Sequence, residues 1–421
     1  MDDPERSVDA DRLWRDVERT GEFGATVSEP ERRGRTAPTG SEANGAARDY
    51  LRDRMSEAGL SVDVDAVGNV RGRWVPDGAD PERAAVAAGS HLDSVPEGGI
   101  FDGPLGVYAA LEAVRAMQDA GVRPGRPVEV VSFTGEEGSR FGGGLVGSSV
   151  ATGKRGVEEA LALTDDEGVT LADALDSVGY RGEGRLDATA WDAWLELHVE
   201  QHTRLEEAGA GVGVVTEVTG ITHVHATVEG AVDHAGSTPM ADRTDALAAA
   251  ADVIGAVEDG ARDLADENGT AVGTVGSLSV EPDATNVVPG RVDLGVDLRD
   301  VERGSVDRML VALEEALSRV ETERGVETST ERSIDLDPTP TSERVRAAVR
   351  EAAEAADVEA LDTHSGAAHD TMHVADVTDA GLLFAPSRDG VSHSPREWTS
   401  KTDCAAATRV LTGALWRLAE D

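Results

Sequence analysis

The stretch "AAVAAGSHLDSVPEGGIFDGPLGV", residues 84–107, joins a strand signal to a cluster of polar residues. It opens on a short, continuous apolar run of the kind that forms a fully buried strand. His91, Asp93 and Asp102 follow this run and are spaced among glycines. The stretch therefore predicts a buried strand with a polar loop at its carboxyl end, and that loop is a candidate metal site.

The segments on either side of this strand continue an α/β alternation. An amphipathic helix over 41–59 and a hairpin over 60–74 precede the strand. A helix over 106–121 follows it, and then come apolar strands over 127–134 and 194–199. Strands that alternate with helices in this way predict an α/β, doubly wound mixed sheet with helices on both faces.

From about residue 213 the pattern changes to strands and long helices of another kind. Two paired strands over 211–230 are followed by further predicted elements, which are a helix over 243–267, strands over 274–282 and 290–300, a helix over 305–325 and a strand over 326–334. A Pro- and Thr-rich stretch, "DLDPTPTSE", then reads as a linker. We therefore predict a catalytic domain in two parts, 1–212 and 333–421, interrupted at 213–332 by an inserted α+β domain of four strands and two helices.

Composition limits the functions that this chain can have. Its 421 residues are too many for one ordinary core, and 39% of them are apolar. With 81 acidic residues against 39 basic ones, the net charge of −42 would repel nucleic acids and anionic membranes. The start "MDDPERSVDADRLW" lacks the basic and apolar segments of a signal peptide, and no window reaches the roughly 20 apolar residues of a membrane span. These features predict a cytoplasmic, halophilic protein with neither nucleic acid nor membrane as a partner.

The candidate metal ligands share one position in the predicted fold. The single cysteine, Cys404, is too little for a thiolate cluster, so a metal ion would have to bind to His, Asp and Glu. Side chains able to bind metal occur at or beyond the carboxyl ends of four predicted strands. They are His91, the pair Glu136 and Glu137, His198 and His393. Open parallel sheets place their active sites at this edge. The four positions together therefore predict one site.

Imidazole and carboxylate ligands without thiolate suit zinc, manganese, cobalt or nickel. Two such ions, roughly 3.5 to 4 Å apart, need a bridging carboxylate and a shared water. Asp102, which is flanked by glycines, fits the bridge, and Asp93, two residues after His91, fits an acceptor for the second ring N–H of that histidine. The adjacent pair Glu136 and Glu137 offers one carboxylate to a metal and one to the attacking water as a general base.

In these residues and their order, the chain resembles the hydantoinase/carbamoylase group of amidases, within the aminoacylase and carboxypeptidase-like superfamily of dinuclear metallohydrolases. The resemblance runs from "TGSEANGAARDYLRDRMSEAGL" to "SHSPRE" and so covers nearly the whole chain. The family's motifs appear in the family's order, as "GSHLDSVPEGGIFDGPLGV", "FTGEEGSRFGGGLVGS", "ELHVEQ", "DHAGSTPMADRTDAL", "TNVVPGRVDLGVDLRD", "SGAAHD" and "FAPSRDGVSHSPRE".

The resemblance implies two divalent metal ions in each subunit, with zinc as the first choice and manganese, cobalt or nickel as alternatives. By position, His91 and His198 would hold one ion, Glu137 and His393 would hold the other, and Asp102 would bridge them. This ligand set would present a metal-bridging water to the substrate.

The resemblance also implies roles for residues that do not bind metal. Glu136 would be the general base, and Asp93 would orient His91. His234, on the inserted domain, would polarise the scissile carbonyl in its own or a partner's site. The inserted domain would act as a lid and mediate a homodimer. Positions that bind substrate in the family correspond here to Gln201, Asn286, Arg299 and His369, with the Arg299 guanidinium suited to a substrate carboxylate.

The spacing of the ligands favours one branch of the superfamily. Peptidase branches usually supply the last ligand of the first metal as a carboxylate soon after the Glu pair, whereas here it is His198, far downstream. We therefore expect hydrolysis of a non-peptide C–N bond in an N-carbamoyl amino acid, a ureido acid or allantoate. The alternatives are an aminopeptidase or dipeptidase of the same superfamily, and a catalytically silent relative, which would lack a ligand or the base.

Three histidines mark departures from the family pattern. His202 and Thr203 stand in "EQHT" where the family usually has "EQGP", and His223 and His225 stand in "ITHVHA" where it has an amide and aromatic or basic residues. The motif "SGAAHD" replaces "SGAGHD". Since the metal ligands are intact, these changes bear on the substrate: the histidines are either new pocket residues or, for His223 and His225, partly exposed strand residues.

Overall fold

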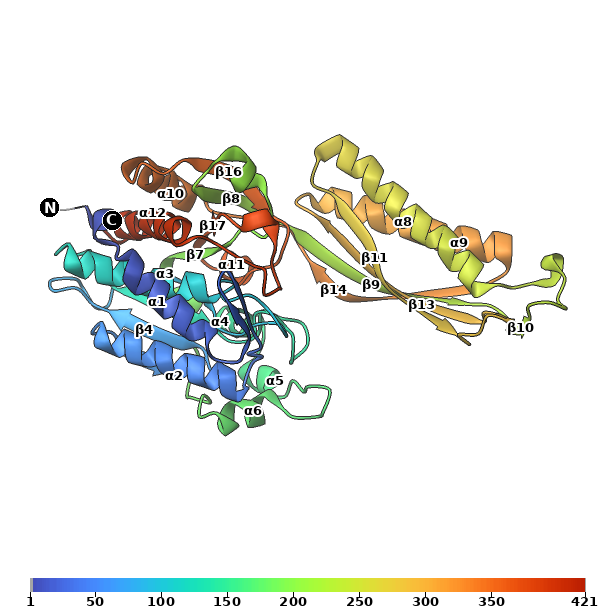
Figure 1. Ribbon diagram of the computed structural model, residues 1–421, viewed down its shortest axis with the longest axis horizontal. Coiled ribbons are helices and arrows are strands. Elements are labelled where there is room, and N and C mark those ends of the chain that lie inside the picture. Colours follow the sequence, from blue (N-terminus) through green and yellow to red (C-terminus); the bar gives the residue numbers. More distant parts are fainter. Residues whose placement is uncertain (1–2, 421) are drawn as a thin grey trace. The chain divides into compact units, whose positions relative to one another are not determined.

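The computed structural model describes residues 3–420, and contacts within the chain divide them into two compact units (Figure 1). The large unit takes in the chain as far as Thr216, together with Pro340–His364 and the segment from His369 onward. The inserted unit consists of Glu217–Thr339 and Ser365–Ala368. It thus begins at 217 rather than at the predicted 213, and it ends at 339 rather than at 332.

A nine-stranded mixed sheet forms the centre of the large unit. Its four middle strands run parallel, in the order β17 (Asp379–Ala385), β7 (Trp191–Val199), β5 (Ala85–His91) and β6 (Val128–Phe133). Strand β8 (Val212–Val218) pairs antiparallel with β17, and β4 (Val70–Trp74) pairs antiparallel with β6. The other strands of this unit are β1 (Ala25–Glu29), β2 (Arg32–Arg35), β3 (Ser61–Val64), β4 (Val70–Trp74), β8 (Val212–Val218), β15 (Thr339–Pro340) and β16 (Ala360–Ser365).

Both faces of the middle strands are buried, which explains why β5 reads as a continuous apolar run. Val86 and Ala88 face the main core, whereas Ala85 and Ala87 face a second core on the other side. The main core is covered chiefly by α1 (Ala10–Gly21), α2 (Glu42–Glu57), α3 (Pro104–Asp119), α10 (Glu343–Ala355) and α12 (Lys401–Glu420). The second core includes residues of α4 (Val146–Ala151) and α11 (Thr371–Val374). Shorter helices are α5 (Val157–Leu161), α6 (Leu171–Ser177) and α7 (Arg204–Ala208).

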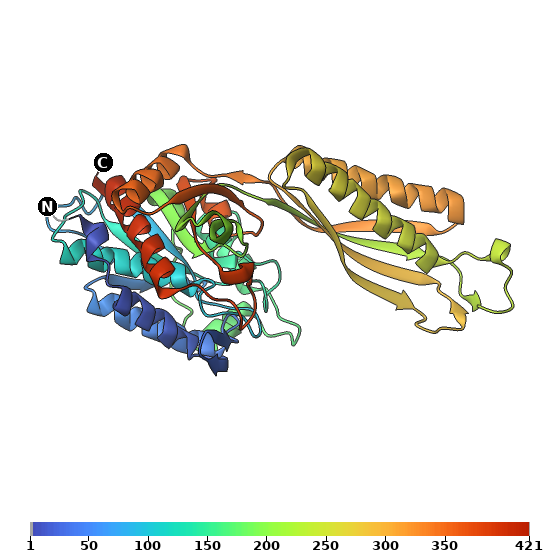
Figure 2. The same ribbon diagram turned by 45° about the horizontal axis from the view of Figure 1, so that its top comes forward.

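The inserted unit is a four-stranded antiparallel sheet with two helices on one face (Figures 1 and 2). The strand order is β11 (Val272–Glu281), β13 (Arg291–Asp300), β9 (Gly220–Glu229) and β14 (Glu327–Leu336). Along β13, buried and half-buried residues alternate, so one face meets the helices and the other stays open. The helices are α8 (Ala246–Asn268) and α9 (Arg303–Arg324), and a two-residue pair joins β10 (Asp233–His234) to β12 (Val287–Val288).

The structure departs from the sequence prediction at the entrance to the inserted unit. We expected the strands within 211–230 to pair with one another, but β8 joins the large sheet beside β17, and β9 lies between β13 and β14. The burial of the strands explains the difference, because the first four residues of β8 are all buried, as a central sheet requires, while β9 also carries half-buried and exposed residues. Within residues 3–420, no helix is long and apolar enough to cross a membrane.

Candidate active site

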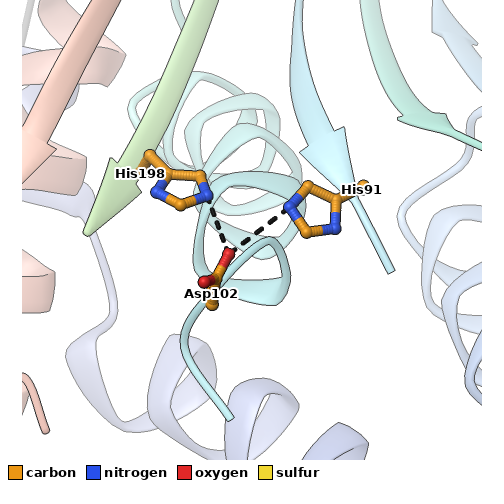
Figure 3. A group of neighbouring side chains, drawn as sticks. All are labelled: His91, Asp102 and His198. Atoms are coloured by element: carbon orange, nitrogen blue, oxygen red, sulfur yellow. Dashed lines mark ion pairs between the residues drawn. The ribbon is translucent and has the colours of Figure 1, made fainter. Parts of the chain in front are cut away.

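Three predicted ligands meet at the carboxyl edge of the large sheet. His91 is the last residue of β5, and His198 is the last but one of the neighbouring parallel strand β7. Asp102 lies in the loop just before α3, and both imidazole rings point at its Oδ1 atom (Figure 3). The distance to Oδ1 is 2.9 Å from His198 Nε2 and 3.5 Å from His91 Nε2. All three side chains are buried.

The second carboxylate oxygen of Asp102 faces a second ligand group. His393 Nε2 lies 3.4 Å from Asp102 Oδ2 and 3.4 Å from Glu137 Oε2. One ligand atom from each of Asp102, Glu137 and His393 lies within 4.8 Å of the others, and the same holds for Asp102 with His91 and His198. Asp102 is thus shared by two groups that each have the composition of a metal site.

Backbone carbonyls fix the tautomers of the two buried histidines. His91 Nδ1 lies 3.1 Å from the carbonyl oxygen of Asp93, and His198 Nδ1 lies 3.1 Å from that of Val199. A carbonyl oxygen only accepts hydrogen bonds, so a neutral ring in either place carries its proton on Nδ1. The Nε2 lone pairs of both rings therefore face Asp102, as metal ligation requires.

Unpartnered atoms at the same place indicate that the residues present fit a cation. His91 Nε2 and Glu137 Oε1 are buried and have no hydrogen-bond partner within residues 3–420. Leaving such atoms unpaired is costly, whereas two imidazoles with two carboxylates are a common ligand set for zinc and similar ions. The donor set, its tautomers and its orphaned atoms agree with binding of divalent metal ions.

The pKa values in the site reflect the same crowding of charge. Burial disfavours the charged form of His91, but Glu136, Asp102 and neighbouring carboxylates outweigh it and raise its pKa well above the usual value. Burial raises the pKa of Glu137 to about 7, and the hydrogen bond to Asp102 is the main cause that raises the pKa of His393 to about 9. These groups hold protons where a metal ion would otherwise supply the positive charge.

Glu136 stands beside the ligand set without belonging to either group. Its Oε2 lies 3.7 Å from His91 Nε2, and its side chain is nearly buried. Burial raises its pKa well above the usual value, against the opposing effect of His91 and with a contribution from Glu137. A carboxylate in this position is suited to accept a proton from a water molecule at the ligand set.

Asp93 contacts other groups than the sequence suggested. We expected its carboxylate to accept the second ring N–H of His91, but the backbone carbonyl of Asp93 does so, and Oδ1 is 3.8 Å from the ring nitrogen. The carboxylate instead accepts the backbone N–H groups of Glu136 and Glu137, at 3.4 and 3.3 Å. The loop turns the carbonyl of Asp93 toward the ring, which frees its side chain to hold the Glu pair.

Two of the predicted substrate-binding residues lie against the ligands. Gln201 Nε2 donates to Asp102 Oδ2 at 3.1 Å. His369 is buried, with its ring edge-on to that of His198 at 4.6 Å between centroids, and burial lowers its pKa well below the usual value. Both side chains therefore pack around the candidate metal ligands within the large unit.

The other predicted substrate-binding residues lie in the inserted unit. Arg299 donates through Nε and Nη2 to the carboxylate of Asp297, both at 2.8 Å, and through Nη1 to the carbonyl of Gly366 at 2.9 Å. His223 Nε2 lies 3.0 Å from Asp297 as well. The guanidinium is thus already paired with a carboxylate, which a substrate carboxylate would have to displace or share.

His234 and Asn286 lie together at the far end of the inserted sheet from Arg299. The pair β10 and β12 aligns His234 with Val287, and the Ala235 N–H donates to the carbonyl of Asn286. The N–H groups of Gly236 and Ser237 donate to His234 Nδ1 at 2.9 and 3.0 Å. Since Nδ1 accepts, the neutral ring carries its proton on Nε2, where it can donate to a carbonyl oxygen. The ring is exposed.

The structure also reveals residues that the sequence analysis did not assign. Glu397 and Ser392 contact Asp102 directly, and the buried carboxyl group of Asp370 interacts electrostatically with Glu136 and His91. A carboxylate four residues after His393, inside a motif already quoted, was the available signal for Glu397. Of the unexplained histidines, His225 lies 3.4 Å from Asp293 on the open face, and exposed His202 bonds its own loop.

Known proteins resemble this chain over nearly its whole length. The family model of peptidase family M20/M25/M40 matches residues 87–417. An N-carbamoyl-L-amino acid amidohydrolase of Geobacillus stearothermophilus is 41% identical over 418 residues, which cover 98% of this chain and 99% of that protein. An allantoate amidohydrolase of Bacillus subtilis is 34% identical, with 88% and 89% covered. A crystal structure from Burkholderia multivorans, an amidase of the hydantoinase/carbamoylase family, has a TM-score of 0.89 at 35% identity and covers 98% of both chains.

The matched segment contains both ligand groups. It begins before His91 and ends after His393, so the strands and loops that carry the candidate ligands all lie within it. Full-length likeness at this identity and the arrangement of the site lead to the same assignment. The chain belongs to peptidase family M20/M25/M40 and, within it, to the hydantoinase/carbamoylase family of amidases.

Proposed function

We propose that this protein is a dinuclear metal-dependent amidohydrolase that cleaves a non-peptide C–N bond of an N-carbamoyl amino acid, a ureido acid or allantoate. The observation that carries the proposal is Asp102, whose two carboxylate oxygens face two separate ligand groups. The names of the relatives support the substrate class, since one acts on N-carbamoyl-L-amino acids and another on allantoate.

The residues divide between two metal ions. His91 and His198 would hold one ion, Glu137 and His393 the other, and Asp102 would bind both. Zinc suits this set best, and manganese, cobalt and nickel remain the alternatives. When bound, such ions polarise a substrate carbonyl and lower the pKa of water.

Glu136 is the proton carrier of the reaction. It accepts a proton from the water that attacks the carbonyl carbon, and it delivers that proton to the nitrogen that leaves. Attack of water breaks one C–N bond of the carbamoyl or ureido group and gives an amine or ammonia together with a carbamic acid. The carbamic acid then decomposes, which breaks the second C–N bond and releases carbon dioxide, so that ammonia and carbon dioxide are the final products of the carbamoyl group. Burial of Glu136 raises its pKa and so strengthens it as a base for this transfer.

The inserted unit completes the site from a second copy of the chain. Arg299 lies near one end of β13 and His234 lies beyond the other end, in the β10 and β12 pair. The eight residue steps from Arg291 to Arg299, at about 3.4 Å each, put roughly 27 Å between these ends. One small substrate spans no such distance, so a His234 that donates to its carbonyl and an Arg299 that binds its carboxylate come from two subunits. Asn286, beside His234, would come with it.

The same unit offers a surface for the homodimer. Edge strand β11 exposes Val272 and Leu278, with 54% and 48% of each residue accessible. An apolar edge strand is an unsatisfied pairing surface that a second copy can cover. The inserted unit would also act as a lid. Closure over the substrate would bring residues of this unit to the ligand set and exclude water.

The surface charge suits a salt-loaded cytoplasm. A net charge of −42 leaves the folded chain with strong self-repulsion that salt screens. The unfolding temperature should rise as potassium chloride is raised from about 0.1 M to several molar. A melting temperature that is the same at all these salt concentrations would contradict this assignment.

An ammonia-release screen tests the proposed function. The purified chain, in high salt, is stripped of metal, reloaded with zinc, manganese, cobalt or nickel, and offered N-carbamoyl amino acids, ureidopropionate and allantoate. Dipeptides are the control substrates, because a peptidase of the same family would cleave them without releasing ammonia. Ammonia from a carbamoyl or ureido substrate, dependent on metal, is the expected result. Turnover of dipeptides alone would overturn the proposal.

A further inference from the structure

We infer that Glu397 is a positioning residue that fixes Asp102 between the two ligand groups. The inference rests on the proposed function, since it concerns the carboxylate that would bind both metal ions. Glu397 lies four residues after His393, in the segment that leads into α12, and it is fully buried.

Each oxygen of the Glu397 carboxylate has a defined task. Oε1 accepts the backbone N–H of Phe101 at 3.1 Å and that of Asp102 at 3.0 Å. Oε2 lies 3.1 Å from the Ser392 hydroxyl, which is also 3.1 Å from Asp102 Oδ2. One side chain thus holds the backbone of Asp102 and, through Ser392, its carboxylate. It also joins the loop of Asp102 to the loop of His393, which are nearly 300 residues apart in sequence.

The surrounding packing shows that this contact is built into the fold. A Cβ atom on Gly99 would lie 2.1 Å from Glu397 Oε1, so only glycine leaves room for the carboxylate against the backbone. On the other side, the rings of Phe101 and Trp398 meet edge to face at 5.3 Å between centroids. The residues next to Asp102 and Glu397 are therefore held by apolar contact, while Glu397 itself supplies the polar bonds.

The orientation of Asp102 is what these bonds determine. Oδ1 lies 2.9 Å from His198 Nε2, and Oδ2 lies 3.4 Å from His393 Nε2. A small rotation of the carboxylate would move one oxygen away from its ligand group. Without Glu397, two buried N–H groups lose their acceptor and the Ser392 hydroxyl loses its contact with the second carboxylate, so the loop of Asp102 would shift or admit water. The geometry of both ligand groups therefore depends on Glu397, although Glu397 belongs to neither of these groups.

Binding of Co²⁺ to the full chain tests the role of Glu397, because the visible absorption of this ion reports its ligand geometry. We expect Glu397→Ala to raise the Co²⁺ dissociation constant by about 10- to 100-fold, to change the absorption spectrum, and to lower kcat at saturating Co²⁺. KM should change less than about threefold, because the substrate contacts remain. In Glu397→Gln the side-chain carbonyl still accepts both N–H groups and its amide can donate to Ser392, so affinity and spectrum should stay near those of the wild type.

Two further variants separate positioning from general stability. Ser392→Ala, at a half-buried position, should shift the spectrum in the same direction by a smaller amount, and it serves if Glu397→Ala does not fold. Glu112→Ala is the matched control, since Glu112 is also fully buried and accepts a backbone N–H, that of Asp9, but lies within α3 away from the ligands. It should lower the melting temperature and leave Co²⁺ binding unchanged.

The outcomes are distinct. Wild-type affinity and spectrum in Glu397→Ala would overturn the inference, and so would an equal loss of Co²⁺ binding in Glu112→Ala. If Glu397→Ala does not fold, an unchanged spectrum in Ser392→Ala would overturn it. A wild-type chain that takes up no Co²⁺ would instead overturn the proposed metal site and, with it, the purpose assigned to Glu397.

Discussion

His234 and Arg299 lie at opposite ends of the inserted sheet, with His234 in the β10 and β12 pair beyond one end of β13 and Arg299 near the other end of that strand. Antiparallel pairing of β13 with both of its neighbours extends from Arg291 to Arg299, so the sheet itself separates the two ends. If both residues act on one substrate molecule, two chains must supply them, and this can be tested without a structure of the dimer.

Mixing two inactive variants is the sharpest test. In a heterodimer of His234→Ala with Arg299→Ala, one of the two sites would combine the intact Arg299 of one chain with the intact His234 of the other. With random pairing, half of the dimers are mixed and have one good site each, so activity should recover to about a quarter of the wild-type value. If both residues serve the site of their own chain, no mixed dimer has a complete site, and co-refolded variants would stay as inactive as each alone.

Replacing the proposed base should separate catalysis from metal binding. Glu136→Gln keeps the size of the side chain and removes its ability to accept a proton, so we expect kcat to fall by about a thousandfold or more. Glu136 belongs to neither ligand group, so metal content measured by elemental analysis should remain that of the wild type. Near-normal turnover, or loss of metal with the activity, would assign the proton transfer to another group.

The shared carboxylate should behave in the opposite way. Asp102→Ala removes a ligand from both groups and leaves His91 and His198 facing each other across an empty position. We expect the loss of at least one metal equivalent per chain together with the activity. His198→Ala is the comparison, since it takes a ligand from one group alone and should spare the other ion. Unchanged metal content in Asp102→Ala would exclude it as the bridge.

How much of this site the sequence predicts depends on where each residue sits. His91 and His198 stand at or near the ends of predicted strands, and parallel strands bring such ends to one edge whatever the loops do. Asp102 and the Glu pair follow within short glycine-containing loops, so residue type and spacing were enough to select them.

The remaining contacts depend on loop conformation, which spacing does not encode. The sequence placed Asp93 near His91, but only the loop geometry decides that its carbonyl, and not its carboxylate, meets the ring. Glu397 reaches Asp102 from nearly 300 residues away, and nothing local marks that pairing. The apolar run of β8 is visible in the sequence. Because a short connection separates it from β9, the two strand signals predict a hairpin. In the structure the chain instead passes from the large unit to the inserted unit at this point.

The contacts of Asp93 lead to a prediction that differs from its expected role. Asp93→Ala leaves the backbone carbonyl in place, so the tautomer of His91 and the binding of its metal should persist. The N–H groups of Glu136 and Glu137 lose their acceptor, so the base is misplaced, and we expect kcat to fall by about 10- to 100-fold. Titration with Co²⁺ and steady-state kinetics check both points. A large loss of metal affinity with unchanged metal-saturated kcat would mean that the carboxylate acts through His91.

Protons and metal ions should compete for the same site across a defined pH range. In the metal-free protein, burial raises the pKa of Glu137 from its usual 4.5 to about 7, and the hydrogen bond to Asp102 raises the pKa of His393 from 6.5 to about 9. Both groups bind protons more tightly in the folded chain than in the unfolded chain. Their contribution to stability is therefore present at low pH and is lost as pH rises from about 4.5 through 9.

Metal binding displaces these protons, so the stabilisation that metal provides should grow over the same range. Thermal unfolding of chelator-treated protein, with and without added zinc and at constant high salt, measures both effects between about pH 5 and pH 9. Glu137→Gln should flatten the lower part of the metal-free profile, and His393→Ala the upper part. A zinc-induced rise in melting temperature that is equal at every pH would contradict the assignment, because it would mean that the ions bind where no proton is displaced.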